Sequence, residues 1–224
     1  MRSHHVMTLT ALVLAISNGA AAQEALYGKQ PPHGSAFVRF VSTLPQSVVI
    51  HKEGREVPLG TATADRVAPY EVIENAASRK LAISVGPSRF TYQPQPDSYA
   101  TLVLAKDSSG AITMTPIVDK AEFNQTRARI AFYNLVPDCK AATLALDPGG
   151  QAVFSDVTFG DTKSRAVNPV QAAVRAACPS GASTTMTLGG MEIGSSYSIW
   201  FAEPGSEPIL LLTRDTSARY DPKG

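Results

Sequence analysis

The sequence predicts an all-β protein built from two tandem antiparallel β-sandwich domains that arise from an internal duplication. Three observations predict this fold. After the first 22 residues, most of the chain consists of short alternating apolar and polar runs separated by Gly, Pro, Asn and Asp, the pattern of strands joined by turns. No segment has a sustained helical period. A stretch near the start also returns, little changed, in the middle of the chain.

The repeat keeps the alternation of side chains. The stretch SAFVRFVSTLP returns 92 residues later as RARIAFYNLVP. Further matches follow with small shifts across turns, and there SYATLV falls on SYSIWF. Because successive side chains of a strand point to opposite faces, a slip of one residue would send core side chains to the solvent. The equivalent pairs are Val38 with Ile130, Phe40 with Phe132 and, after the shifts, Asp119 with Asp215.

These matches divide the chain into four parts. We expect a signal peptide at residues 1–22, an N-terminal sandwich at 23–118, a linker at 119–127 and a C-terminal sandwich at 128–224. Adjoining domains usually move relative to each other unless they share an apolar interface. Phe37 and Val41 lie on the strand face opposite Phe40, and they are candidates for such an interface or for a partner surface.

Turn residues divide each half into a meander of strands. The expected strands include LAISV, RFTY and SYATLVLA in the first half, and TTMTL and SYSIWFA in the second. In the turn DPGG, Pro148 suits φ near −65° and Gly149 suits a positive φ. One segment has an alternative. VQAAVRAA could form two helical turns, with Val170, Ala173, Val174 and Ala177 on one face.

The first residues predict export. Arg2 precedes an apolar run of 11 residues from Val6 to Ile16, and small residues follow as far as Ala22. Such a run is too short to cross a bilayer, and its flanks are those of a secretory signal peptide. No later run reaches transmembrane length. We expect cleavage before Gln23 and a soluble periplasmic protein, with an uncleaved anchor as the alternative.

Charge and cysteine usage limit the partners and the compartment. Without Arg2, the Lys and Arg residues equal the 19 Asp and Glu residues in number, so no basic field attracts nucleic acid. Cys139 and Cys178 are the only cysteines, and in an oxidising compartment such a pair indicates a disulfide. The alternatives, a redox site or a metal site, would favour Cys-x-x-Cys spacing or nearby histidines.

The sequence does not support an enzyme. A serine nucleophile needs an imidazole to accept its proton, and only His33 and His51 follow the signal peptide. Ser35 is close to His33 in sequence, but side chains on an extended segment point apart and no nucleophile-elbow motif surrounds the pair. GDTKS carries Thr162 where secreted esterases carry serine. Scattered carboxylates predict no metal, and we expect no cofactor.

Aromatic residues raise the question of sugar binding, because exposed rings stack on sugars. Tyr197 and Trp200 are the candidates for glycan stacking, since they lie three residues apart in SYSIWFA. The alternative is that Trp200 belongs to the core.

ALYG, from Ala25, and PPHGSAFVRF, from Pro31, resemble the opening of the alginate biosynthesis protein AlgF family. The resemblance extends over essentially the whole chain in length, signal peptide and strand order. Its sharpest part is this N-terminal segment, which carries no catalytic signature. The matching residues are Tyr27, Gly28, Gly34, Phe37, Val38 and Arg39.

The resemblance implies a non-catalytic periplasmic protein required for O-acetylation of an exopolysaccharide. Such a protein would be an adaptor or carrier between a membrane-bound O-acyltransferase and periplasmic SGNH-type acetyltransferases. The candidate partner-binding residues are Tyr27, Gly28, Phe37 and Arg39. Two alternatives stay open: a carbohydrate-binding module that holds alginate or cellulose, and an acetyl-transfer enzyme that uses Ser35 and His33.

Overall fold

A computed structural model describes residues 30–119, 126–179 and 181–221. The expected signal peptide, Tyr27, Gly28 and most of the expected linker lie outside the described residues. We refer to residues 30–119 as the N-terminal half and to residues 126–221 as the C-terminal half. Pro31–Arg219 form one compact unit by their contacts.

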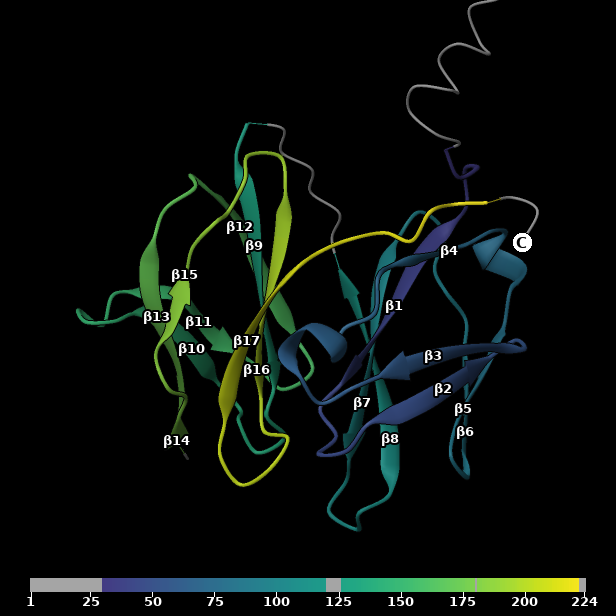
Figure 1. Ribbon diagram of the computed structural model, residues 1–224, viewed down its shortest axis with the longest axis horizontal. Coiled ribbons are helices and arrows are strands. Elements are labelled where there is room, and N and C mark those ends of the chain that lie inside the picture. The colour runs from purple at the N-terminus through teal and green to yellow at the C-terminus, as the bar shows by residue number, and fades with distance from the viewer. Residues whose placement is uncertain (1–29, 120–125, 180, 222–224) are drawn as a thin grey trace, which may run out of the picture. The chain divides into compact units, whose positions relative to one another are not determined.

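The described residues are almost entirely strands and turns, which confirms the all-β prediction (Figure 1). The N-terminal half contains β1 (Ala36–Ser42), β2 (Val48–Lys52), β3 (Arg55–Leu59), β4 (Glu71–Ile73), β5 (Leu81–Val85), β6 (Ser88–Tyr92), β7 (Tyr99–Lys106) and β8 (Ile112–Asp119), with single 3-10 turns η1 (Thr63–Asp65) and η2 (Ala76–Ser78). The C-terminal half contains β9 (Ala128–Leu135), β10 (Ala142–Leu146), β11 (Ala152–Val157), β12 (Thr162–Val167), β13 (Ala172–Cys178), β14 (Gly181–Ala182), β15 (Met186–Leu188), β16 (Ser196–Ala202) and β17 (Ile209–Arg214).

The two halves have the same strand order. The N-terminal half forms sheets β4-β1-β7-β8 and β3-β2-β5-β6. The C-terminal half forms β12-β9-β16-β17 and β11-β10-β13, in which β13 also pairs with β14 and β15. Each strand thus has a counterpart in the other half, with β14 as an addition. This correspondence is what an internal duplication predicts, and the duplication stays an interpretation of it.

Not all strand pairs are antiparallel, so the prediction that each half is a simple antiparallel meander is corrected. β1 pairs in parallel with β7, and β9 pairs in parallel with β16. The expected hairpin of LAISV and RFTY is confirmed as β5 and β6. The next strand, β7, belongs to the other sheet and does not pair with that hairpin. VQAAVRAA contributes β13 instead of helical turns.

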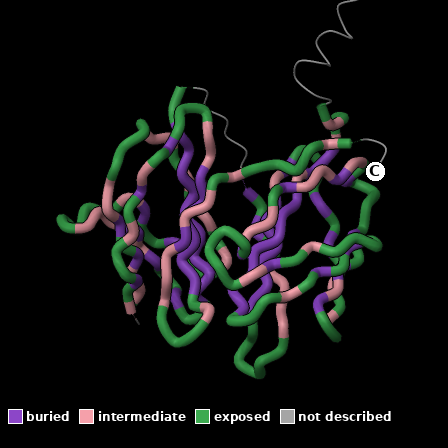
Figure 2. The backbone as a smooth tube through the Cα atoms, viewed as in Figure 1, coloured by how far each residue is buried: buried purple, intermediate pink, exposed green. Residues whose placement is uncertain are grey.

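Each half buries its own apolar core between its two sheets, and Figure 2 shows the buried residues gathered along the strands. Val38 and Phe40 enter the N-terminal core, and Ile130 and Phe132 enter the C-terminal core. The predicted parity of these four positions is therefore confirmed.

The letter match between SYATLV and SYSIWF is wrong by one residue. Ala100 lies opposite Val38, and Tyr197 lies opposite Ile130, so Ala100 corresponds to Tyr197 and not to Ser198. The two tyrosines that the letters align consequently face different environments. Tyr99 stacks on Phe37 with 4.4 Å between ring centroids, whereas Tyr197 packs in the C-terminal core.

A third apolar cluster contains residues of both halves. β1, β7 and β8 contribute Val41, Val103 and Ile117 from the strand faces that point away from the N-terminal core. β9, β16 and β17 contribute the remaining members, and we call the whole set the central cluster. The expectation that Val41 belongs to an apolar interface is confirmed. The members from the C-terminal half are Ala131, Tyr133, Leu135, Trp200, Ala202 and Leu211.

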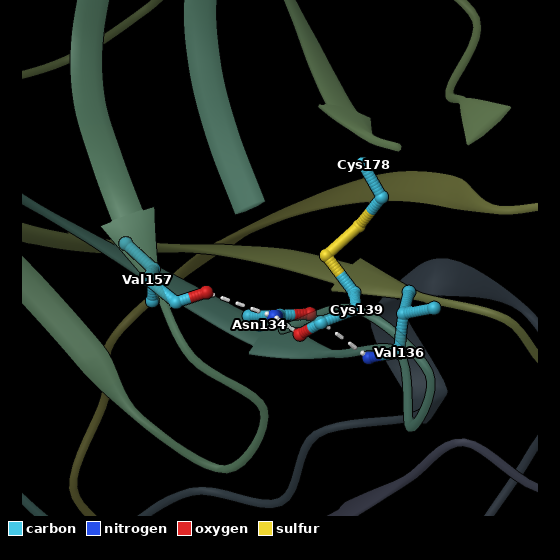
Figure 3. The surroundings of a disulfide bond; sticks show 5 residues. All are labelled: Asn134, Val136, Cys139, Val157 and Cys178. Carbon is cyan, nitrogen blue, oxygen red and sulfur yellow. Dashed lines mark hydrogen bonds between the residues drawn. A yellow bond between two sulfur atoms is a disulfide. The ribbon is translucent and has the colours of Figure 1, made fainter. Parts of the chain in front are cut away.

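The disulfide between Cys139 and Cys178 is present, with 5.7 Å between the two Cα atoms. Beside it, Asn134 is fully buried at the end of β9 (Figure 3). Its Nδ2 donates to the carbonyl oxygens of Cys139 at 2.8 Å and Val157 at 2.9 Å, and its Oδ1 accepts from the amide of Val136 at 3.1 Å. One buried amide therefore satisfies three backbone groups where the chain turns toward the disulfide.

Candidate functional site

The most densely connected polar residues lie at the central cluster, around Arg39. β1 alternates its side chains, so Arg39 points to the same face as Val41 and away from the N-terminal core. Only 1% of the Arg39 surface is exposed. Its guanidinium donates from Nε to Thr101 Oγ1 at 2.9 Å and from Nη1 to Asp215 Oδ1 at 2.6 Å. Burying an arginine requires this kind of pairing, because an unpaired charge in the interior is costly.

The other guanidinium nitrogen connects Arg39 to the C-terminal half. Nη2 donates to the hydroxyl of Tyr133 at 3.1 Å and to Ser198 Oγ at 2.9 Å. Ser198 in turn donates to Asp215 Oδ1 at 2.7 Å. Side chains from β9, from β16 and from the residue after β17 thus hold the arginine of β1.

Three aromatic rings surround the same guanidinium. Its central carbon lies 4.3 Å from the ring centroid of Tyr70 and 4.7 Å from that of Trp200. Tyr133 stacks on Trp200 with 4.1 Å between centroids, and Trp200 Nε1 donates to Thr213 Oγ1 at 2.9 Å. Cation–π attraction is strongest where water is excluded, so these rings favour the charged arginine in its buried position.

A second carboxylate completes what we call the Arg39 network. Asp119, at the end of β8, accepts at Oδ2 from Tyr133 at 2.7 Å and from Tyr70 at 3.2 Å. Burial raises the pKa of Asp119, while the Tyr133 hydrogen bond and the charge of Arg39 oppose that rise. The network consists of Arg39, Tyr70, Thr101, Asp119, Tyr133, Ser198, Trp200 and Asp215.

The ionisation states follow from the same contacts. Burial alone would lower the pKa of Arg39, but the value is raised, because the ionised forms of Tyr133 and Tyr70, the charge of Asp215 and the hydrogen bond to Asp215 together outweigh burial. Burial also raises the pKa of Tyr133 and of Tyr70. Arg39 therefore stays charged and both tyrosines stay neutral near pH 7.

The backbone after β17 joins the two halves a second time. Tyr70 donates its amide hydrogen to the carbonyl of Thr216 at 2.8 Å, and Ala218 donates its own to the carbonyl of Tyr70 at 2.7 Å. Tyr70 and Ser217 form a parallel bridge. The C-terminal segment thus pairs with the residue that precedes β4.

Several predicted site residues lie elsewhere than sequence reasoning placed them. Arg39 is buried, so the expectation that it contacts a partner directly is corrected: its hydrogen-bonding capacity is used within the chain. Tyr197 is 5% exposed and Trp200 is 0% exposed, so neither ring offers a face to a sugar. Phe37 is half-buried against Tyr99.

The residues considered for catalysis do not come together. Ser35 is buried and donates its hydroxyl hydrogen to the carbonyl of Pro32 at 2.7 Å. His33 is exposed, and His51 lies 3.6 Å from Glu56 at the surface. Among the described residues, no hydrogen bond joins either histidine to a hydroxyl group. The described part of the chain also contains no cluster of three or more His, Cys, Asp and Glu side chains that could hold a metal ion.

Sequence reasoning missed most of the Arg39 network, but one signal was available. The repeat aligns Asp119 with Asp215. Asp119 is the last residue of β8 and lies opposite Tyr99, and Asp215 directly follows β17 and donates its amide hydrogen to the carbonyl of Ser196. A carboxylate that recurs at equivalent strand ends in both halves is a pattern that sequence reasoning could have detected. The sequence gives no comparable signal for Thr101 or Ser198.

Comparison with known proteins gives two matches. Residues 9–188 match the family model described as "Alginate O-acetyl transferase AlgF". A curated relative, "Alginate biosynthesis protein AlgF" of Pseudomonas aeruginosa, is 29% identical over 174 residues, which cover 73% of this chain and 74% of the relative. In the segments that the structure describes, no helix has the length and apolar character needed to cross a membrane.

Proposed function

Because this chain belongs to the AlgF family and therefore has a role in alginate O-acetylation, we propose that it acts there as a non-catalytic periplasmic adaptor. Its partners are a membrane-bound O-acyltransferase, which supplies acetyl groups from the inner membrane, and periplasmic SGNH-type acetyltransferases, which place them on the polymer. The chain is exported through its signal peptide, and the Cys139–Cys178 disulfide is in keeping with an oxidising compartment.

One observation carries the non-catalytic assignment. The buried ionisable side chains at the central cluster satisfy one another and join the two halves, instead of converging on an open cleft. Acyl transfer to or from a serine needs a base within hydrogen-bonding reach and a site for the oxyanion. The Ser35 hydroxyl donates to the carbonyl of Pro32, and the described histidines lie on the surface. The family description names a transferase, and an adaptor that the transfer requires accounts for that name without catalysis in this chain.

The architecture supports an adaptor mechanism. Two sandwiches joined by an apolar cluster, a buried arginine and a backbone pairing present their outer sheets in a fixed relation. A rigid body with separate surfaces can bind two proteins and hold their sites near each other, which raises the effective concentration of one at the other.

The proposal is tested in a strain that makes acetylated alginate and lacks this gene. We expect the wild-type gene to restore the acetyl content of the polymer, and a gene carrying His33→Ala, His51→Ala and Ser35→Ala to restore it to a similar level. Loss of acetylation with normal amounts of the triple variant would contradict the proposal. The same chain should retain the two acetylation enzymes in a pull-down, and should show no acetyl turnover when purified alone.

A chain that binds the polymer, instead of the two enzymes, would give different results in these binding experiments. Affinity electrophoresis through gels containing alginate or cellulose measures it directly, because a chain that binds polymer is retarded. Retardation without retention of either enzyme would replace the adaptor by a carbohydrate-binding module.

A further inference from the structure

Arg66 is a buried cation to which the described part of the chain supplies no carboxylate. It directly follows η1, and its carbonyl accepts the amide hydrogen of Ser42 at 2.9 Å, so it lies where β1 ends. Only 6% of its surface is exposed. Among the described residues, no ion pair includes Arg66. A charge that is buried without a counter-charge is costly.

In this respect Arg66 differs from the other buried cations of the described residues. Each of the others interacts with a carboxylate: Arg39 with Asp215, Lys52 with Glu71 and Arg129 with Asp119. The carboxylate nearest to Arg66 in sequence, that of Asp65, lies against Gly60. Burial lowers the pKa of Arg66, and no charged group opposes this effect. The positive charge of Arg66 is therefore uncompensated.

Within the described residues, Arg66 uses one of its three side-chain nitrogens. Nη1 donates to the carbonyls of Ser42 at 3.2 Å and Leu44 at 2.9 Å. Nε and Nη2 have no hydrogen-bond partner among the described residues, and neither is among the buried polar atoms that lack a partner. Both nitrogens are therefore accessible to solvent. A lysine could donate to the same two carbonyls, so this capping does not account for a guanidinium.

The free edge of the guanidinium has the geometry that a carboxylate requires. Nε and Nη2 present two N–H groups side by side in one plane, and this fork matches the two oxygens of a carboxylate. One guanidinium carries one positive charge, which a carboxylate balances and a doubly charged phosphate exceeds. Because burial limits solvation of the charge, its attraction for a carboxylate is stronger than at an exposed arginine.

Arg89 provides a matched arginine at the surface. Its Nη1 also donates to two backbone carbonyls, those of Gly86 at 2.8 Å and Ser88 at 3.1 Å. Among the described residues, no ion pair includes Arg89 either. Arg89 is exposed, so water solvates its charge and a carboxylate gains little there. The comparison of Arg66 with Arg89 therefore isolates the effect of burial.

We propose that Arg66 is a binding site for one carboxylate group, which Nε and Nη2 hold side by side. Two sources have this chemistry: a free small carboxylate such as acetate, and the side chain of an Asp or Glu on a protein partner. Both can bring a carboxylate to a recessed guanidinium. The site itself is independent of the proposed adaptor function, and only the protein source rests on that function.

Nuclear magnetic resonance of the arginine Nε–H groups in the purified wild-type chain measures the binding. Sodium acetate replaces sodium chloride at constant ionic strength. We expect the Arg66 resonance, identified by its loss in Arg66→Lys, to shift with saturation and with a dissociation constant at least about tenfold lower than that at Arg89. Equal shifts at the two arginines, without saturation, would overturn the site.

An oligosaccharide of alginate at the same carboxylate concentration is the second arm of the titration. It should leave the Arg66 resonance unchanged, because its carboxylates are attached directly to bulky sugar rings that cannot approach a residue with 6% exposure. A saturable shift with the oligosaccharide would overturn the restriction to free and side-chain carboxylates.

A pair of lysine variants identifies the source. Arg66→Lys keeps the charge and a donor for the carbonyls of Ser42 and Leu44 but removes the fork, and Arg89→Lys is its surface control. If the source is an acidic side chain, the first variant should weaken binding to one of the two acetylation enzymes at least about tenfold, and the second should not. If the source is a free carboxylate, neither variant changes enzyme binding, and Arg66→Lys still loses the acetate response.

The outcomes separate this inference from the proposed function. Failure of the wild-type chain to bind either enzyme overturns the adaptor function, whereas the acetate titration still decides the site. Absence of a saturable acetate response at Arg66 overturns the site, even where both enzymes bind. If Arg66→Lys fails to fold, as judged by circular dichroism, the titration of the wild-type chain decides, with the Arg66 resonance assigned through its bonds to the backbone.

Discussion

Arg39 illustrates how one residue can link two sandwiches. It leaves β1 on the face opposite the N-terminal core and meets Tyr133, Ser198 and Asp215 of the C-terminal half. A buried and fully paired charge of this kind contributes little to the net free energy of folding. Its removal is expensive, because the partners are left buried without it.

Arg39→Met should therefore lower the free energy of unfolding by about 3–5 kcal/mol, since it leaves Asp215 without its charged partner and three hydroxyl groups without the guanidinium donor. Urea denaturation measures the change. The matched surface variant Arg79→Met, at an exposed pair with Glu53, should change it by about 0–1 kcal/mol. Equal effects of the two variants would show that the buried network contributes no more than a surface ion pair.

Asp119 gives a prediction about pH. Burial raises its pKa in the folded chain, so the folded state holds this proton more tightly than the unfolded state does. Through this residue, the free energy of unfolding falls as pH rises from about 4, the ordinary value, through the raised pKa. Asp119→Asn removes that titration and keeps an acceptor for Tyr133.

We thus expect the free energy of unfolding of Asp119→Asn, minus that of the wild-type chain, to increase between pH 4 and pH 7. Urea denaturation at four or five pH values gives both curves. A difference that decreases over this range would mean that the carboxylate, and not its protonated form, is favoured in the folded chain.

At the scale of elements, the strands could be predicted better than their partners. The alternation in LAISV and RFTY predicts β5 and β6, because the face of each side chain is a local property. The parallel pairing of β1 with β7 joins residues about 60 positions apart, and no local pattern encodes that choice. The register error at Tyr99 and Tyr197 has the same origin, since identical letters can face opposite sides of equivalent strands.

The site was predicted least well for a related reason. From the sequence, Arg39 was a candidate for partner binding and Trp200 a candidate for glycan stacking or for the core, but a charge or a large ring on a strand can face either solvent or a second domain. That choice depends on the packing of one half against the other. The candidate positions at Tyr27 and Gly28 lie outside the described residues and stay predictions.

The disulfide is the element-scale feature with the most direct test. It joins β13 to the turn after β9 and closes a loop of 39 residues, for which the chain-entropy model gives about 4 kcal/mol. Cys139→Ser with Cys178→Ser should lower the free energy of unfolding by about 2–5 kcal/mol. Urea denaturation of the wild-type chain with a reductant is the control, and it should reproduce the loss. If the reductant leaves the stability of the wild-type chain unchanged while the double variant is destabilised, the loss comes from the packing of the serines and not from the disulfide.

On the scale of the whole molecule, the central cluster determines whether two sandwiches behave as one body. Adjoining domains with small polar interfaces move independently. Here an apolar cluster of nine buried residues, the Arg39 network and the pairing of Tyr70 with the C-terminal segment all connect the halves. An adaptor of this construction would hold its partners at a set distance instead of tethering them loosely.

A protease site inserted between Asp119 and Thr126 tests this coupling. After cleavage, the two halves should remain together in gel filtration at micromolar concentration, because the contacts that join them do not depend on the covalent connection. Arg39→Met in the cleaved chain should shift the elution toward separate halves, since it removes the buried charge pairing across the interface. The surface variant Arg79→Met should not. Separation of the cleaved wild-type halves would show that the connection, and not the central cluster, holds the sandwiches together, and a fixed spacing between partners would then have no structural basis.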